Sequence, residues 1–139
     1  MNKFTVLLLG LSGFMAACQP DYQVRDQAIA VHDEIMPKME PFVQTSMRID
    51  TLLLHLDSLH AIHPDLDTLH LREELTLLRD QITTANDAMN EWMHGFEMEP
   101  QGNKETVENF FEQQKQQIDS VKTLYDQTEQ AIEKQEFLK

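Results

Sequence analysis

Residues 71–96, LREELTLLRDQITTANDAMNEWMHGF, decide the fold, because their apolar side chains recur alternately four and three residues apart. Such an alternation is a heptad seam, which places one apolar stripe along a helix and requires partner helices to cover it. The segment therefore predicts a long helix that stops before Pro100, with a loop over residues 101–103. The seam positions are Leu71, Leu75, Leu78, Ile82, Ala85, Met89, Trp92 and Phe96.

A second helical pattern precedes this seam and covers about residues 21–59. Its apolar residues recur at three- and four-residue steps, with interruptions at Pro37 and Pro41. Each proline lacks an amide donor and crowds the carbonyl four residues earlier, so we expect a kink in this helix. Met36 and Glu40, which precede the prolines, are expected to leave helical dihedral angles.

A third helical pattern begins near Asn103. Its apolar side is diluted by Gln114 and Thr128, which predicts looser packing for this helix. Before the seam, a turn follows the first pattern, and Asp65 or Asp67 is placed to cap the next helix.

These patterns predict an all-α fold. Three long helices joined by short loops form an antiparallel three-helix bundle, here with a Pro-kinked first helix and coiled-coil-like packing. An elongated coiled coil is the alternative arrangement. The composition agrees, because only two glycines follow residue 18 and strand-favouring alternation is sparse.

The N-terminal residues predict export. Lys3 precedes an apolar run over residues 4–14, which is too short to span a bilayer as a helix. Residues 15–18, MAAC, resemble a bacterial lipobox, in which an apolar residue and two small ones precede a cysteine. We therefore predict a signal peptide over residues 1–17 and a fatty acyl anchor, palmitate included, on Cys18. The alternative is an ordinary cleavage site beside an accidental cysteine.

Domain organisation follows from this assignment. Residues 18–21 are predicted to be a lipidated tether and residues 22–139 a single helical domain. The chain has one cysteine, so no intramolecular disulfide can form. The predicted location is the cell envelope, as a membrane-anchored lipoprotein on the periplasmic side or the cell surface.

The charge balance restricts the partners. The formal net charge is −13, and removal of Lys3 with the signal peptide changes it to −14. An acidic surface repels nucleic acid, whose binding depends on basic side chains that neutralise phosphates. It also disfavours anionic lipid surfaces, so we expect the acyl chains alone to hold the domain at a membrane.

Methionines gather in two patches that an antiparallel pairing brings to one level. If the first turn centres near residue 63, residue 36 lies opposite residue 90. Thioether and imidazole ligands together suit a soft ion such as Cu(I). Methionine also fills irregular gaps in a core, which explains the patches with no cofactor required. The candidate ligands are His32, Met36, Met39, Met89, Met93 and His94, of which His94 faces away from the seam.

Other chemistry has less support in the sequence. Glu91 and His94 have the spacing found in di-iron carboxylate bundles, but those sites need a second such pair. Four histidines near the first turn, with nearby aspartates, suggest a zinc site or a pH response, although their spacing is irregular. No phosphate loop or serine elbow is present, so we expect no enzyme. The four histidines are His55, His60, His63 and His70.

Two stretches are distinctive: residues 32–39, HDEIMPKM, and residues 91–96, EWMHGF. On these residues the chain resembles an uncharacterised family of small helical lipoproteins from Bacteroidota, often labelled "viral A-type inclusion protein". The label reflects coiled-coil similarity. The resemblance implies an exported helical lipoprotein and carries no activity.

The leading hypothesis is a lipid-anchored helical bundle that acts as a non-catalytic interaction or scaffold module of the cell envelope. Its expected partner is an envelope protein, docked on an exposed helix face or on the third helix. The competing hypothesis is a module that binds Cu(I) or a small ligand through the Met/His layer between the first two helices.

Overall fold

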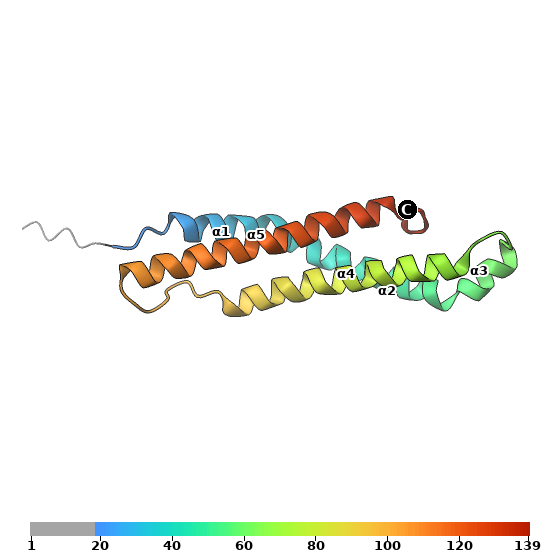
Figure 1. The fold of residues 1–139 in the computed structure, drawn as a ribbon, viewed down its shortest axis with the longest axis horizontal. Helices are drawn as coiled ribbons and strands as arrows, with labels where there is room; N and C mark the ends of the chain where they lie inside the picture. The colour runs from blue at the N-terminus through green and yellow to red at the C-terminus, as the bar shows by residue number, and fades with distance from the viewer. Residues whose placement is uncertain (1–18) are drawn as a thin grey trace, which may run out of the picture.

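The computed structural model describes residues 19–139, and all the regular secondary structure of this range is helical, as the sequence predicts (Figure 1). The predicted signal peptide and Cys18 lie outside the described residues. In chain order the elements are α1 (Gln23–Ile35), the 3₁₀ helix η1 (Met36–Lys38), α2 (Met39–Leu54), α3 (Leu56–Ile62), α4 (Thr68–Gly95), α5 (Lys104–Lys134) and the 3₁₀ helix η2 (Glu136–Leu138).

The first predicted helix is divided into several elements. Pro37 lies in η1, and Pro41 is the third residue of α2. The amides of a first helical turn have no partner within the helix, so a proline there removes no hydrogen bond. The expectation for Met36 is wrong, because its φ of −52° and ψ of −39° are right-handed helical. A second break at His55, with φ −108° and ψ 10°, separates α2 from α3.

α1 and α2 run in the same direction as α5. Four hydrogen bonds between these segments join residues that are 87 to 91 positions apart, from one end of α1 to the end of the chain. An almost constant separation requires two helices that advance together at the same rise per residue. The four pairs are Asp21–Glu108, Glu34–Lys122, Lys38–Glu129 and Arg48–Leu138.

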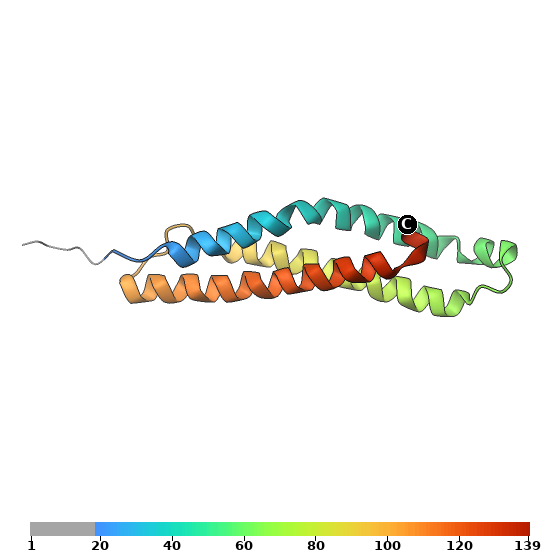
Figure 2. The ribbon, with the colours of Figure 1, turned by 90° about the horizontal axis from the view of Figure 1, so that it is seen from above.

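α4 runs in the opposite direction. The ring of His32 stacks on Trp92, whereas Asp50 pairs with Arg79, so residue numbers fall along α4 as they rise along α1 and α2. Four helices pack together in this way, with α5 against both α1 and α4, and α2 against α4 (Figures 1 and 2). α3 and the turn after it lie at the end of the molecule opposite the start of α1 (Figure 1).

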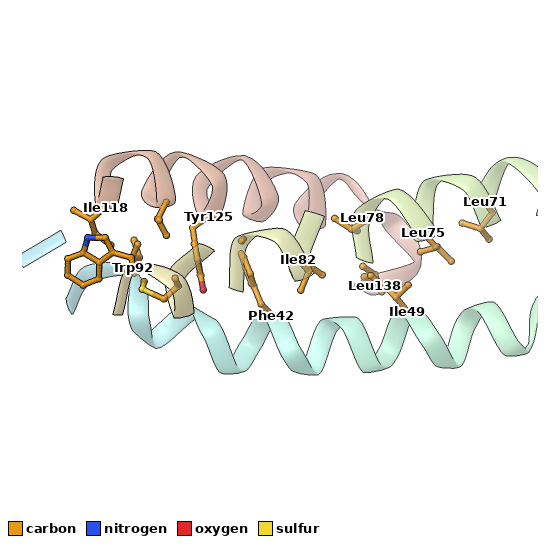
Figure 3. Packing of buried hydrophobic residues seen from close by; sticks show 14 of the residues in the cluster. Phe42, Ile49, Leu71, Leu75, Leu78, Ile82, Trp92, Ile118, Tyr125 and Leu138 are labelled. Carbon is orange, nitrogen blue, oxygen red and sulfur yellow. The ribbon is translucent and has the colours of Figure 1, made fainter. Parts of the chain in front are cut away.

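The seam of α4 is buried as predicted. Its members from Leu71 to Trp92 are all at most 6% exposed, and Phe96, one residue beyond the helix, is half-buried. Gln114 and Thr128 of α5 are also buried, at 6% and 3% exposure, so α5 is not the loosely packed helix that the sequence predicts. Figure 3 shows Tyr125 of α5 pointing toward Phe42 of α2 within this core.

Short polar residues fix where the long helices begin. The Asp67 carboxylate accepts a hydrogen bond from the His70 amide, and Asn103 accepts one from the Thr106 amide, both at 3.0 Å. Each caps a helix by satisfying an amide without an intrahelical partner. Of the two predicted candidates for the α4 cap, Asp67 is therefore the one used. Gly102 has φ +148°, and a Cβ there would lie 2.9 Å from the Thr106 side chain.

We predict that two leucines of α4 differ sharply in their effect on stability. Leu75 is fully buried and Leu77 is 61% exposed. Leu75→Ala should lower the free energy of unfolding by about 2–5 kcal/mol, because it leaves a cavity in the core. Leu77→Ala should cost less than about 1 kcal/mol. Urea unfolding followed by circular dichroism measures both; equal losses would contradict the burial of the α4 seam.

Candidate functional site

The predicted meeting of the two Met patches occurs around Trp92. The imidazole of His32 stacks on the indole, with ring centroids 5.4 Å apart and planes inclined by 26°. The indole Nε1–H donates to the backbone carbonyl of Gln114 at 3.0 Å. Residue 32 of α1 therefore meets residue 92 of α4, close to the pairing that the sequence predicts, and α5 closes the same layer.

The methionines of this layer divide between core and surface. Met89 is fully buried, and Met39 and Met93 are half-buried against the same apolar cluster. Met36, in contrast, is 45% exposed. The structure thus packs three of the four candidate thioethers on one core, where methionine fills space between helices.

The two candidate histidines differ in their surroundings. His32 is half-buried, and its Nδ1 lies 2.9 Å from the Asp33 carboxylate. His94 is exposed, and its Nδ1 lies 2.6 Å from the Asn90 carbonyl on its own helix. Of the candidate ligands, His32, Met39, Met89 and Met93 are thus buried or half-buried, whereas His94 is exposed and contacts its own helix.

The histidines around the first turn do not converge. His60 Nδ1 lies 3.3 Å from the Leu66 carbonyl, and His70 Nε2 lies 3.3 Å from the Glu74 carboxylate. Within residues 19–139, no three His, Cys, Asp or Glu side chains come together in a way that would hold a metal ion. The zinc and di-iron arrangements considered from the sequence have no counterpart in this part of the chain.

Ion pairs join α1 and η1 to α5. Lys38 contacts Glu129 at 2.7 Å and Asp126 at 3.6 Å, and Lys122 contacts Glu34 at 2.5 Å and Asp126 at 3.4 Å. The hydrogen bond with Glu129 raises the pKa of Lys38, and the one with Glu34 raises the pKa of Lys122. These ion pairs are exposed to solvent, so each adds little to the free energy of unfolding. Their main effect is to favour one alignment of α1 and η1 along α5.

Tyr125 is the ionisable group placed deepest in the described core. Its ring stacks on Phe42 with centroids 4.9 Å apart, and its hydroxyl donates to the Asn86 side-chain oxygen at 2.7 Å. Burial raises the pKa of Tyr125 to about 12, because the phenolate would lose its hydration. Together, Phe42, Asn86 and Tyr125 fix α2, α4 and α5 at one level.

Sequence reasoning missed an apolar stripe on the outer side of α2. Val43, Met47 and Leu54 are 42%, 59% and 82% exposed, respectively. They are four and seven residues apart, which places them on one helix face, away from the core positions Phe42 and Ile49. The spacing was visible in the sequence, but only the packed structure tells which of two apolar faces of α2 is covered.

Comparisons with known proteins identify no relative. No family model, no curated protein and no solved structure matches the chain. None of the helices in residues 19–139 is long and apolar enough to cross a membrane.

We predict that Tyr125 makes the fold sensitive to alkali. Its pKa is higher in the folded chain than the ordinary value of 10.0, so its contribution to stability is complete below pH 10 and is lost as the pH rises toward 12. Between pH 9 and pH 11 the unfolding free energy should fall by about 1 kcal/mol through this group.

Tyr125→Phe is the matched control for this effect. The variant should lose about 1 kcal/mol at pH 9, because the bond to Asn86 is gone. The difference in unfolding free energy between the variant and the original chain should shrink at pH 11, because the buried tyrosine destabilises the original chain at that pH. A deficit of the same size at both pH values in urea unfolding would refute the buried-phenol assignment.

Proposed function

We propose that this protein is a lipid-anchored, non-catalytic interaction module of the cell envelope, held to a membrane through Cys18. The observation that carries the proposal is the sequence at the junction between the predicted signal peptide and the helical domain. An apolar run and the sequence MAAC over residues 15–18 end at the only cysteine, and the helical domain follows within a few residues. Two or three acyl chains, at about 0.8 kcal/mol per buried methylene, anchor such a domain stably.

The place of the segment before α1 supports a tethering role. This segment (blue) lies at the end of the molecule formed by the loop after α4 and the start of α5 (Figures 1 and 2). Asp21 donates its backbone N–H to Glu108, and the Tyr22 ring packs on Phe111 with centroids 5.9 Å apart. The predicted tether is thus attached closely to one end, so an anchor on Cys18 would direct the opposite end, with α3, away from the membrane.

The chemistry of the interior supports a non-catalytic role. Across residues 19–139, the buried side chains are apolar apart from Gln114, Thr128 and the phenol of Tyr125. Catalytic acids and bases usually take perturbed pKa values from burial or close charges in a cleft. In the described part of the chain the carboxylates and imidazoles lie at the surface or only half-buried, which suits solubility and docking.

For the fold of this module we propose an antiparallel three-helix bundle. In this view α1, η1, α2 and α3 form one arm that bends at Pro37, and α4 and α5 form the other two arms. The parallel alignment of the first arm with α5 and its antiparallel alignment with α4 support the assignment. A bundle of this kind presents long helix faces, which are surfaces for a protein partner of the envelope.

Soft-metal binding is the second candidate. Met39, Met89 and Met93 belong to or pack against the core cluster that also contains Trp92, on which His32 stacks, and thioethers are ligands that suit a soft ion. In this function the layer would take up Cu(I), and Met36 would have to turn inward to complete the set. Core filling explains the same contacts without an ion.

We predict that Cys18→Ser abolishes acylation and cleavage of the precursor. The original chain should incorporate labelled palmitate and partition into the detergent phase, because its acyl chains are apolar. The variant should incorporate no label and remain an uncleaved precursor. Equal labelling of both proteins would refute the anchor, while Ala17→Ser, which keeps a small residue before the cysteine, serves as the processing control.

A Cu(I) titration of the full chain against a competing chelator decides between the two candidate functions. The interaction module predicts no binding above the chelator background. The metal module predicts one tight equivalent by mass spectrometry, abolished when Met39, Met89 and Met93 are all replaced by leucine. That replacement keeps the core volume, so the helix signal in circular dichroism should persist. Tight copper binding would overturn the proposal that the layer only fills the core.

A further inference from the structure

A groove runs along the outer side of the contact between α4 and α5. Three hollows follow one another along it, with volumes of about 460, 230 and 290 Å³ in order from the end of α5. The first two hollows share Leu77 and Gln81. The third lies one helical turn farther along both helices, at Ala88 of α4 and Ser120 of α5.

The α4 residues of this groove repeat with the spacing of the buried seam. Each precedes a seam residue by one position, so together they form a stripe at the edge of the covered face. The stripe extends from residue 74 to residue 91, which corresponds to about 26 Å along a helix. Its members are Glu74, Leu77, Gln81, Thr84, Ala88 and Glu91.

Short side chains line much of the groove. Thr84 and Ala88 line it on α4, and Ser120 and Ala131 line it on α5. Short side chains let the ridge of another helix insert between two packed helices. Leu77, which is 61% exposed, adds an apolar surface in the same groove. The groove therefore has room for a helix and an apolar residue on which that helix can pack.

The other two grooves between the long helices are bridged by ion pairs. Lys38 and Lys122 join η1 and α1 to α5, and Arg79 joins α4 to Asp50 of α2. The two hollows between α2 and α4 are lined by two acids and two arginines, whose charges cancel. Within residues 19–139, no ion pair joins α4 to α5. The α4–α5 groove is thus free of such bridges.

The charged residues that line the three hollows make this groove acidic. Four of them are acids and one is a base, so their formal charges sum to −3. A groove of this charge attracts a cationic helix and repels a second copy of a chain whose net charge is −13. The acids are Glu74, Asp80, Glu91 and Glu136, and the base is Lys134.

Two of these acids have a carboxylate available for a partner. Glu91 and Glu136 lie in the hollows at opposite ends of the groove, both are exposed, and neither forms an ion pair in the part of the chain that the structure describes. Asp80, in contrast, lies 3.7 Å from Arg79, and Glu74 lies 3.3 Å from the His70 ring. Carboxylates at both ends select a helix that carries basic residues near both of its ends.

We propose that the α4–α5 groove binds a cationic helix of a partner protein, which packs lengthwise as an additional helix of the bundle. The inference rests on the proposed role as an interaction module and names its surface and the chemistry of its partner. Leucine or alanine side chains of the partner would pack on Leu77, Thr84 and Ala88. Its lysines or arginines would pair with Glu91 and Glu136.

The test uses the full chain in nanodiscs of zwitterionic lipid, with empty nanodiscs as background. The probe is a labelled synthetic helix of about 18 residues, ~27 Å long, with leucines and alanines on one stripe and lysines near both ends. An acidic version with glutamates for lysines and a scrambled version of the basic peptide are the peptide controls. Binding is measured by fluorescence anisotropy at low and moderate salt.

Two neighbouring threonines of α4 provide a matched pair of substitutions. Thr84 lines the α4–α5 groove and Thr83 lines the α2–α4 side. Both are exposed, and each donates its hydroxyl to the carbonyl four residues earlier, at 2.8 and 3.1 Å. Thr84→Arg and Thr83→Arg add the same charge, so charge repulsion alone would weaken binding of the basic peptide equally. Docking in the groove should instead weaken by more than about tenfold with Thr84→Arg and by less than about twofold with Thr83→Arg.

A second pair of variants tests the acids that select the partner. Glu91→Gln combined with Glu136→Gln should weaken binding about fivefold, because two ion pairs with the peptide are lost. Glu112→Gln combined with Glu133→Gln removes the same charge from exposed residues of α5 that line none of the three hollows. This control should change binding by less than about twofold, and equal weakening by both double variants would overturn the role of the groove acids.

The remaining outcomes also decide the proposal. Failure of the basic peptide to bind the original chain removes the proposed occupant, and equal binding of the acidic or scrambled peptide removes its charge or its stripe. Stronger weakening by Thr83→Arg than by Thr84→Arg places docking on another face and leaves an interaction module in place. Acylation is read separately with Cys18→Ser, so the anchor and the groove fail independently. Circular dichroism confirms that each variant is folded, and the glutamine variants decide alone if Thr84→Arg does not fold.

Discussion

Burial of one apolar stripe on α4 holds the rest of the molecule together. The stripe has seven fully covered members from Leu71 to Trp92 along a helix of 28 residues. Each large member removed from water contributes about 1.5–3 kcal/mol, and no single neighbouring helix covers the whole length. α2 packs along α4 and α5 packs along it as well, and α3 covers its first turns. The elongated shape follows, because a long stripe needs long partners.

Polar contacts at two levels determine how these helices align along their axes. The indole of Trp92 donates to the Gln114 carbonyl, and the Tyr125 hydroxyl donates to Asn86. A shift of α5 by one turn would break both bonds. Such a shift is unfavourable, because a buried donor without its acceptor costs free energy. A repeating apolar seam can pack in several alignments along the helix axis. The two hydrogen bonds can form in only one of these alignments. Lys38 and Lys122 extend the same alignment to the surface between α1 and α5.

The described surface combines many acidic side chains with one group of exposed apolar side chains. Acidic side chains spread over the helices give the chain a formal net charge of −13. Against this background the apolar side chains of Val43, Met47 and Leu54 form a surface that nothing in the described chain covers. The proposed anchor on Cys18 would fix the location of this exposed surface, which suits the proposed interaction module.

The sequence by itself determined the helical class, the α4 seam, the start of the last long helix near Asn103 and the approximate level at which α1 meets α4, because each follows from local spacing and turn position. Tertiary structure decided the rest. Gln114, Thr128 and Met89 are buried, whereas Met36 is exposed. The burial of each side chain depends on the residue that lies opposite it, and the spacing of residues in the sequence does not specify that neighbour. Two further features depend on how the four helices pack against one another. They are the position of both prolines in first helical turns and the exposed apolar stripe on α2.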